Sequence, residues 1–218
     1  MARIARVVIP GLPHLVTQRG AVFSGEADYG LYKRFLGEET AKRGVMILGW
    51  CLMPDHCHLI LVPADARGLA LAMGRLQWRY ARQFNARAGR SGPLFPARYS
   101  SVVMDDSHFR AALAYVDGNP LRARLVRRAE DWPWSSARGH LGLGNDDLVA
   151  APLPPGLAAD HAATLSLHEN WPETTALRRA EIIGRPAGSA SFVAEVETRL
   201  KRKLAPGRRG RPRLAVAA

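Results

Sequence analysis

Cysteine is scarce in this sequence, and long apolar runs are missing. Only Cys51 and Cys57 occur among 218 residues, which excludes a disulfide framework and a four-cysteine zinc site. The longest apolar stretches, such as Val45–Leu48 and Leu59–Val62, fall far short of the ~20 residues that a membrane span needs. The apolar Val7–Ile9 is too brief for a signal-peptide core. We therefore expect a cytoplasmic protein of bacterial type with no membrane partner.

The glycine-rich motifs of nucleotide-binding proteins and the serine motif of hydrolases are also missing. Neither a dinucleotide fingerprint nor a phosphate-binding loop stands between a strand and a helix, so a nucleotide cofactor is not expected. No G-x-S-x-G occurs, and nothing pairs Cys51 with a base, which argues against serine and cysteine hydrolases. Hydrophobic residues make up 47% of the chain, enough for the core of one folded protein.

Positive charge is abundant. Lysine and arginine number 31 against 19 acidic residues, a net charge of +12, and this sign favours a polyanionic partner such as nucleic acid. An arginine-rich proteome is the competing explanation. Two stretches without any acid concentrate the charge: Arg75, Arg79, Arg82, Arg87 and Arg90, and a C-terminal block from Arg199 to Arg213.

Hydrophobic periodicity predicts an α+β fold. We expect strands at His14–Arg19, Val45–Leu52, His56–Val62 and Tyr99–Met104, and helices over 28–43, 69–84 and about 106–118. The order β-α-β-β-α-β followed by one helix predicts a ferredoxin-like or RRM-like antiparallel sheet with helices on one face.

The C-terminal third differs in character. We expect a catalytic domain over residues 1–142, a helical extension over 143–205 and a disordered basic tail over 206–218. Pro152, Pro154, Pro155 and Gly156 suggest a linker inside the extension, with helices near 174–183 and 191–204.

His56 and His58 form the sharpest chemical motif. Two residues apart on a predicted strand, both imidazoles emerge on the same face, ~7 Å apart along the strand and within reach of one metal ion. Cys57 then points to the other face and is expected to be a buried apolar residue rather than a ligand. A polar sheet face or a core histidine pair is the alternative.

Tyr115 and Asn119 lie four residues apart at the end of the last predicted helix. If the helix continues, they are neighbours on its surface, and the amide oxygen of Asn119 can complete a two-histidine site for Mg²⁺ or Mn²⁺. An asparagine before Pro120 is equally an ordinary helix stop. A tyrosine beside such an ion can attack a phosphodiester and form a covalent phosphotyrosine.

These segments together resemble the REP-associated tyrosine transposases, which belong to the single-tyrosine HUH transposases. The resemblance covers nearly the whole chain, and its motifs lie at 13–20, 50–61, 115–123, 131–137, 184–189 and 209–213. It implies the sheet fold that was derived above. It also implies that His56, His58 and Asn119 are metal ligands and that Tyr115 is the nucleophile. The implied activity is nicking and joining of single-stranded DNA beside a folded palindrome. Asp117-Gly118 before Asn-Pro is less usual in that family and can loosen the helix that carries Tyr115.

Seven arginines are the predicted DNA contacts: Arg19, Arg75, Arg79, Arg82, Arg209, Arg211 and Arg213. The last three resemble an AT-hook core, although a merely disordered basic tail explains them as well. A solvated helix face is the alternative for residues 75–82. Trp78, Trp132 and Trp134 can stack on unpaired bases, and the last two can instead pack the end of the domain.

Three hypotheses follow. The first is a Mg²⁺- or Mn²⁺-dependent tyrosine transposase that acts on single-stranded or hairpin DNA at the bacterial nucleoid, as a monomer or homodimer. The second is a metal-dependent phosphodiesterase in which the histidines activate water and Tyr115 is structural. The third is a non-catalytic RRM-like nucleic-acid-binding protein.

Overall fold

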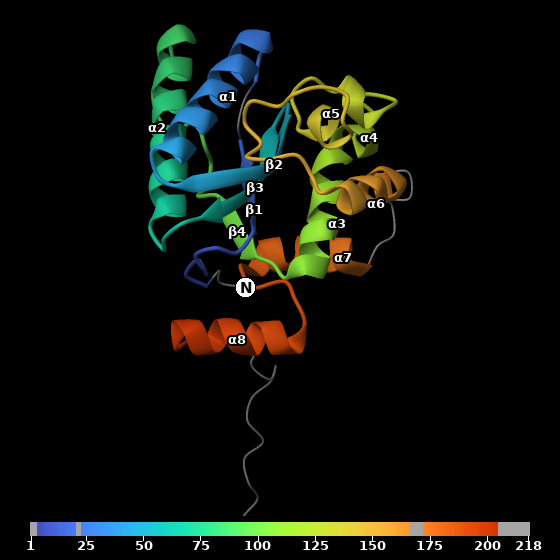
Figure 1. The fold of residues 1–218 in the computed structure, drawn as a ribbon. Coiled ribbons are helices and arrows are strands. Elements are labelled where there is room, and N and C mark those ends of the chain that lie inside the picture. Colours follow the sequence, from blue (N-terminus) through green and yellow to red (C-terminus); the bar gives the residue numbers. More distant parts are fainter. Residues whose placement is uncertain (1–3, 21–22, 166–171, 205–218) are drawn as a thin grey trace, which may run out of the picture.

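The computed structural model describes residues 4–20, 23–165 and 172–204, which are arranged as in Figure 1. Six elements come in the predicted order: β1 (His14–Arg19), α1 (Glu26–Ala41), β2 (Val45–Met53), β3 (His56–Pro63), α2 (Gly68–Arg87) and β4 (Ser100–Val103). Seven short or medium helices follow: α3 (Asp106–Asp117), α4 (Asn119–Arg122), the 3-10 helix η1 (Ala129–Asp131), α5 (Ala137–His140), α6 (Pro155–Leu165), α7 (Pro172–Ile183) and α8 (Ala190–Leu200).

The four strands form one antiparallel sheet in the order β2-β3-β1-β4. This is the ferredoxin-like order of a β-α-β-β-α-β unit, so the predicted α+β fold is confirmed. The central strands pair with Thr17 opposite His58 and Arg19 opposite His56. Residues from the two middle strands therefore meet near the start of β3.

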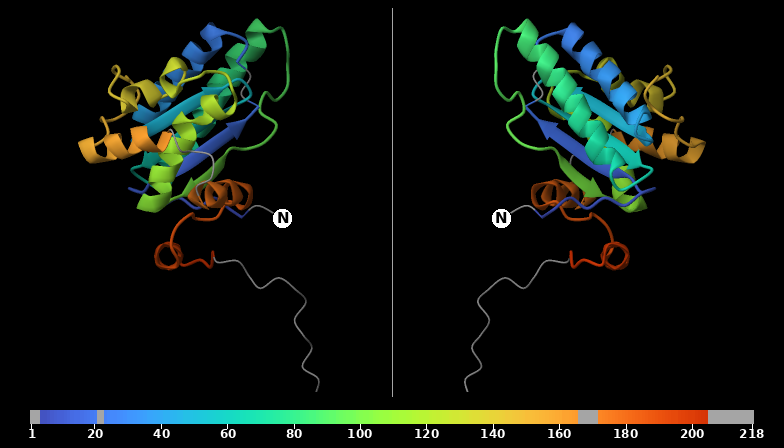
Figure 2. Two further views of the ribbon diagram at one scale, coloured as in Figure 1. Left: turned by 90° about the vertical axis from the view of Figure 1, so that its right-hand side faces the viewer. Right: turned by 90° about the vertical axis from the view of Figure 1, so that its left-hand side faces the viewer.

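Each face of the sheet is covered by different helices (Figures 1 and 2). Cys57, Leu59 and Leu61 of β3 belong to the core beneath α1 and α2. Ile60, which alternates with them, belongs to the core beneath α3 and α7, together with Leu177. The two helices of the predicted unit thus share one face, and the helices that follow the unit cover the other. The histidines fall on the α3 side, because side chains alternate along a strand.

The extension contains one more helix than the sequence predicts. Residues 155–165 form α6, and its first two residues, Pro155 and Gly156, were expected to belong to a linker. Pro155 is the first residue of this helix, a position where proline costs no backbone hydrogen bond, and Leu157, Ala158 and Leu165 favour a helix beyond it. Pro155 is therefore a helix start rather than part of a linker.

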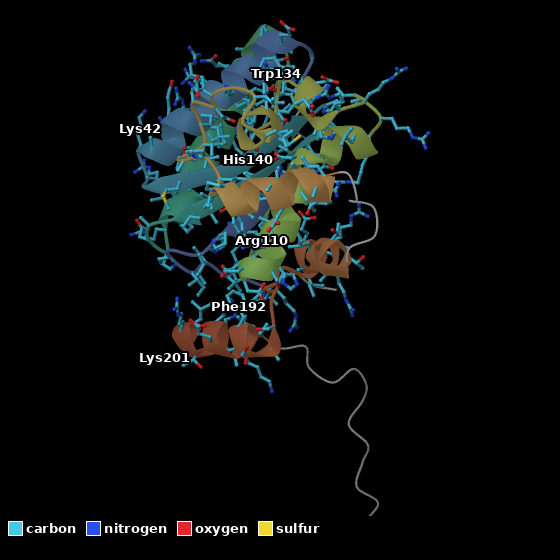
Figure 3. The ribbon with its side chains drawn as sticks, turned by 45° about the vertical axis from the view of Figure 1, so that its right-hand side comes forward. Lys42, Arg110, Trp134, His140, Phe192 and Lys201 are labelled. Atoms are coloured by element: carbon cyan, nitrogen blue, oxygen red, sulfur yellow. The ribbon has the colours of Figure 1, made fainter. Side chains whose placement is uncertain are left out.

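Helix α8 is the last helix in the described part of the chain. It packs on the N-terminal segment through a small core that contains Val7, Ile9 and Val196, and Phe192 lies on the side of α8 that faces the rest of the molecule (Figure 3). The predicted tail at 206–218 lies outside the described residues. In the described ranges, no helix has both the length and the apolar composition needed to cross a membrane. The predicted division at residues 142 and 205 stays a prediction.

The imidazole of His14 ties the N-terminal segment to β1. Its Nε2 atom accepts the backbone N–H of Ile9 at 3.2 Å, and its Nδ1 atom therefore donates to the carbonyl of Leu12 at 2.8 Å. Burial lowers the pKa of His14 from 6.5 to about 4, since a charged imidazole would lose its hydration there.

We predict that acidification destabilises the fold through His14. Its folded pKa lies below its unfolded pKa, so the stability it contributes is complete above pH 6.5 and is lost as the pH falls to about 4. The loss from this group should be on the order of 3 kcal/mol, measured by urea unfolding across this pH range. His14→Gln should be less stable at pH 7 but lose less on acidification. Equal losses in both proteins would contradict this account.

Candidate active site

Two imidazoles lie side by side at the start of β3. The ring centroids of His56 and His58 are 4.8 Å apart, and the rings are nearly perpendicular. His58 is buried, whereas His56 is half-buried. The predicted convergence of the two side chains on one face is therefore present. Cys57 points the other way into the core, where its thiol lies 3.2 Å from the hydroxyl of Tyr32.

An oxygen atom engages the Nδ1 atom of each histidine. Asp55 Oδ1 lies 2.6 Å from Nδ1 of His56, and this hydrogen bond lowers the pKa of Asp55. Thr17 Oγ1 lies 2.8 Å from Nδ1 of His58 and donates its own proton to Glu181 Oε1 on α7. An imidazole whose Nδ1 carries the proton keeps its lone pair on Nε2, the form in which histidine binds metal ions.

Burial keeps the second imidazole neutral. The pKa of His58 lies well below its usual 6.5, first because the ring is desolvated and then because His56, Arg122, Arg19 and Arg178 place positive charge nearby. A neutral ring is what metal coordination requires.

Tyr115 faces this histidine from α3. Its ring meets the His58 ring edge to face, with centroids 5.1 Å apart. The guanidinium of Arg122 lies 4.5 Å and that of Arg178 5.5 Å from the centre of the Tyr115 ring. Burial and the nearby Glu181 raise the pKa of Tyr115, while Arg122 and a hydrogen bond from Arg178 oppose that rise. The phenol is therefore protonated at neutral pH but lies beside two cations that favour its ionised form.

These side chains surround one cavity of about 430 Å³. Its lining residues come from both central strands, β4, α3 and α7: Thr17, Arg19, His56, His58, Ser100, Tyr115, Arg178, Glu181 and Ile182. Arg19 and Arg178 are exposed while His58 and Thr17 are buried. The cavity thus has cationic side chains toward solvent and imidazole nitrogens deeper inside.

Asn119 does not line this cavity. It begins α4, two residues after Asp117 at the end of α3, and Pro120 follows it within the first turn. The side chain is buried, and its Nδ2 atom has no hydrogen-bond partner among the described residues. Because the oxygen and nitrogen of an amide are exchanged by a flip, an oxygen can occupy that unpartnered position. Its role as a ligand stays a prediction.

The predicted DNA-contacting arginines occupy different environments. Arg19 lines the cavity. Arg79 instead forms ion pairs of 2.6 Å with Glu38 and Glu39 of α1, and so joins α1 to α2. Arg209, Arg211 and Arg213 lie outside the described residues.

Arg75 and Arg82 flank an exposed tryptophan on α2. Their guanidinium carbons lie 4.2 Å and 5.5 Å from the ring centre of Trp78, whose side chain is 48% exposed. Trp134, in contrast, stacks on Tyr29 with centroids 4.9 Å apart, and the indole N–H of Trp132 donates to a β2 carbonyl. The latter two tryptophans pack the end of the domain.

A buried hydrogen-bond network holds the end of the tyrosine helix. The carboxylate of Asp117 accepts from Ser136 Oγ at 2.8 Å, from His140 Nδ1 at 2.6 Å and from His161 Nε2 at 2.9 Å. His140 Nε2 also donates to the carbonyl of Leu48 at 2.9 Å. Figure 3 shows His140 next to α6, the helix that carries His161. Four segments therefore meet two residues after Tyr115.

Charge explains the strength of this network. Burial opposes ionisation of both groups, but the neighbouring imidazoles hold the pKa of Asp117 well below its usual range, and Asp117 in turn raises the pKa of His140. Gly118, expected to loosen the helix, has helical angles of φ −81° and ψ −3°. The Asp117-Gly118 sequence thus anchors the helix rather than loosening it.

In the described ranges, these three side chains are the one group of at least three histidine, cysteine, aspartate or glutamate residues whose ligand atoms are close enough to share a metal ion. The ligand atoms of Asp117, His140 and His161 all lie within 4.8 Å of one another. The separations of 2.6 and 2.9 Å are hydrogen-bond lengths. The cluster is therefore held together by hydrogen bonds from the two imidazoles to the carboxylate.

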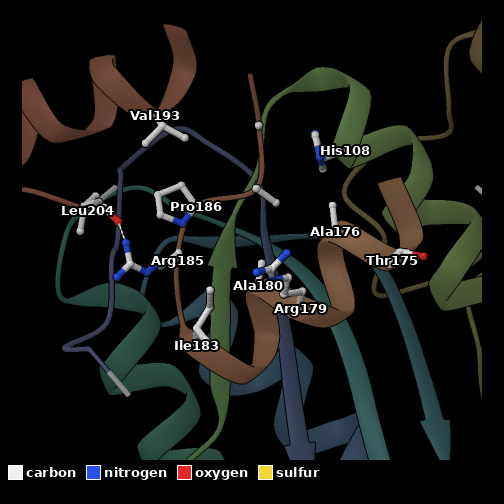
Figure 4. A pocket seen from close by; sticks show the side chains of 12 residues that line it. His108, Thr175, Ala176, Arg179, Ala180, Ile183, Arg185, Pro186, Val193 and Leu204 are labelled. Atoms are coloured by element: carbon white, nitrogen blue, oxygen red, sulfur yellow. Dashed lines mark hydrogen bonds between the residues drawn. The ribbon is translucent and has the colours of Figure 1, made fainter. Parts of the chain in front are cut away.

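A second cavity, of about 410 Å³, lies between α7 and α8 (Figure 4). It is lined mainly by apolar groups, including Ala176, Ile183 and Val193. Arg185 donates to the carbonyl of Leu204 at its edge. This cavity shares no lining residue with the histidine site.

Sequence reasoning did not include three residues of the site: Thr17, Arg178 and Glu181. Thr17 lies in a motif of the resemblance, and its position opposite His58 follows once β1 and β3 are paired in register. Arg178 and Glu181 are brought to the site by the packing of α7 on α3, for which the sequence carries no local signal.

A ferredoxin-like sheet with a histidine pair facing a single tyrosine has the arrangement implied by the resemblance to tyrosine transposases. Residues 14–119 match the model of the family described as transposase IS200 like. This match confirms the resemblance to the tyrosine transposases.

Known proteins extend this comparison. A Haemophilus influenzae protein named as a REP-associated tyrosine transposase is 27% identical over 97 residues, which cover 39% of this chain and 55% of that protein. The chain therefore spans about half the length of this curated relative. A solved structure, described as a REP-associated tyrosine transposase bound to a REP hairpin, is 18% identical, with a TM-score of 0.50 over 71% of this chain and 100% of that one. A transposase structure from Deinococcus radiodurans is 18% identical, with a TM-score of 0.37 over 60% and 98%.

We predict that Asp117→Asn destabilises the protein by about 3–5 kcal/mol, because it leaves the buried His140 cation without its counter-charge. Urea unfolding monitored by tryptophan fluorescence measures the change. Asp160→Asn is the control, since Asp160 lies on α6 beside His161 but is exposed and forms only a 3.6 Å surface pair with Arg110. Equal stability of the two variants would show that the network contributes nothing.

Proposed function

We propose that this protein cuts and rejoins single-stranded DNA next to a hairpin through a covalent bond to Tyr115. The observation that carries the proposal is the phenol of Tyr115 lying against the His58 ring in a cavity that also holds two arginines. A nucleophile, a pair of metal-binding nitrogens and cations for a phosphate thereby meet in one place.

The donor set fits a divalent ion. His56 and His58 would hold it through their Nε2 atoms, because Nδ1 of each is engaged by Asp55 or Thr17. We propose the amide oxygen of Asn119 as the third ligand. The amide oxygen and the phosphate oxygens of the DNA suit Mg²⁺ or Mn²⁺, and when bound such an ion would polarise a phosphate and neutralise charge on the leaving oxygen.

The arginines would place the DNA backbone. Arg19 and Arg178 are exposed at the cavity and can each bind a phosphate oxygen. Arg75 and Arg82, with Trp78 between them, offer a further contact on α2. Contacts of this kind make the affinity for DNA fall steeply with salt.

Tyr115 would act as the nucleophile. Its hydroxyl oxygen attacks phosphorus, the bond from phosphorus to the 3′ oxygen breaks, and the DNA is left with a free 3′-OH and a 5′ phosphate joined to the tyrosine. Arg178, which hydrogen-bonds the phenol, stabilises the charge on the oxygen as its proton leaves. Attack by a 3′-OH on the phosphotyrosine reverses these changes and joins a strand.

The structural relative bound to a REP hairpin supports hairpin DNA as the substrate. We propose that the protein would meet such a substrate at the bacterial nucleoid. We further propose that residues 1–142 form the catalytic domain and that residues 143–205 supply α7, which closes one side of the cavity.

We predict a covalent complex between the protein and labelled hairpin-bearing single-stranded DNA in Mn²⁺. The adduct should survive denaturing electrophoresis and should be lost in Tyr115→Phe, because the ester needs the phenolic oxygen. Tyr99→Phe is a matched control and should leave the yield unchanged, since the buried Tyr99 hydroxyl has no hydrogen-bond partner in the part of the chain that the structure describes.

The other outcomes identify the competing functions. Cleavage without an adduct that persists in Tyr115→Phe would point to a phosphodiesterase that uses water. Binding without cleavage would indicate a nucleic-acid-binding protein.

We also predict that His56→Ala and His58→Ala each weaken Mn²⁺ binding at least 10-fold, because each removes one of two imidazole ligands. Electron paramagnetic resonance of free Mn²⁺ measures the affinity without DNA. His108→Ala, at the opposite end of α3 from Tyr115, should bind Mn²⁺ like the unchanged protein. Unchanged affinity in both site variants would place the ion elsewhere.

A further inference from the structure

We propose that Thr17 and Glu181 form a hydrogen-bonded relay that holds His58 in its metal-binding tautomer. Glu181, on helix α7, is then a positioning residue for the metal site. This inference deepens the proposed function, because it concerns the same histidine pair.

The relay crosses three elements. Thr17 of β1 lies directly opposite His58 of β3, and its hydroxyl oxygen is 2.8 Å from His58 Nδ1. The same hydroxyl donates to Glu181 Oε1 of α7, and that carboxylate oxygen is 3.8 Å from His58 Nδ1. All three side chains are buried, so bulk water does not compete for these hydrogen bonds.

The direction of the hydrogen bonds fixes the tautomer. A carboxylate can only accept, and a hydroxyl has a single proton to give. Since Thr17 gives that proton to Glu181, its lone pair faces His58 and Nδ1 of His58 must be the donor. The lone pair of the ring is then on Nε2. Without Glu181, the hydroxyl is free to turn and donate to Nδ1, which would move the ring proton to Nε2.

For His56, a carboxylate next to it in the sequence fixes the same tautomer. Its Nδ1 atom is 2.6 Å from the carboxylate of the preceding residue, Asp55. His58 lies deeper in the sheet, and its carboxylate comes from a residue 123 positions further along the chain, through Thr17. Both imidazoles thus have an oxygen acceptor on Nδ1, the usual arrangement around metal-bound histidine.

Helix α7 is firmly placed to perform this role. Leu177 and Ala180 are buried in the core shared with α3, while Arg178 and Glu181, one turn apart, line the cavity. The helix lies beyond residue 119, where the match to the transposase family ends. A residue outside the matched segment therefore completes the histidine site.

Two measurements on the full chain test the relay. The first is the tautomer of His58 in metal-free protein, read from its imidazole ¹⁵N chemical shifts without DNA. We expect protonation at Nδ1 in the unchanged protein and a shift of the proton toward Nε2 in Glu181→Ala and Thr17→Val. The second is Mn²⁺ affinity, which should fall 10- to 100-fold in these variants.

Conservative variants separate the relay from simple packing. Thr17→Ser keeps the hydroxyl, and Glu181→Gln keeps an oxygen that can accept from it, so both should retain the tautomer and most of the affinity. Glu195→Ala is the control for loss of a carboxylate, because Glu195 is exposed on α8 and pairs only with Arg199 at the surface. It should change neither measurement.

Specific results would overturn the proposal. An unchanged His58 tautomer in both Thr17→Val and Glu181→Ala would overturn it. If Thr17→Val does not fold, an unchanged tautomer in Glu181→Ala alone would overturn it. If Glu181→Gln loses Mn²⁺ affinity but keeps the His58 tautomer, Glu181 acts as a direct metal ligand or through its negative charge, and not through the relay. If the tautomer responds as expected but no DNA adduct forms, the relay stands and the proposed strand transfer fails.

Discussion

The pairing register between β1 and β3 is the constraint on which the rest of the site depends. Antiparallel pairing places Thr17 opposite His58 and Arg19 opposite His56, and the two-residue period of a strand puts both imidazoles on the face covered by α3. A slip of one residue would turn both rings into the core beneath α1 and α2. The apolar residues Leu59 and Leu61 prevent that slip, because they would then leave their own core.

A second constraint acts on the helix that faces the histidines. Asp117 is buried with two imidazoles and a hydroxyl around it, and removing any charged group from water is costly unless partners replace that water. Here Ser136 and His140 come from the start and end of α5 and His161 comes from α6, so the carboxylate is satisfied only when α3, α5 and α6 are all in place. The orientation of Tyr115, two residues earlier, follows from this requirement.

The parts predictable from the sequence are those governed by local periodicity. The four strands, the buried stripe of α2 and the common face of His56 and His58 all follow from spacing along the chain. The motif at residues 115–123 also singled out Tyr115 correctly as a neighbour of the histidines.

What could not be predicted depends on contacts between distant segments. Arg79 was expected to be free for DNA but is engaged by Glu38 and Glu39, because α1 and α2 pack side by side. Glu181 reaches His58 only through the packing of α7. Periodicity says which face of a helix is buried and nothing about which polar groups it meets there, so these partners required the tertiary structure.

The position of α7 also bears on how such genes evolve. The imidazoles at positions 56 and 58 and the carboxylate at position 181 are far apart in the coding sequence, with the tyrosine at position 115 between them. Recombination between diverged copies of the gene, at a junction between codons 119 and 181, would join the sheet of one lineage to a helix α7 that evolved in contact with the sheet of another. Chimeras of this kind would keep the histidines and the tyrosine but would pair Thr17 and His58 with a residue 181 from another lineage.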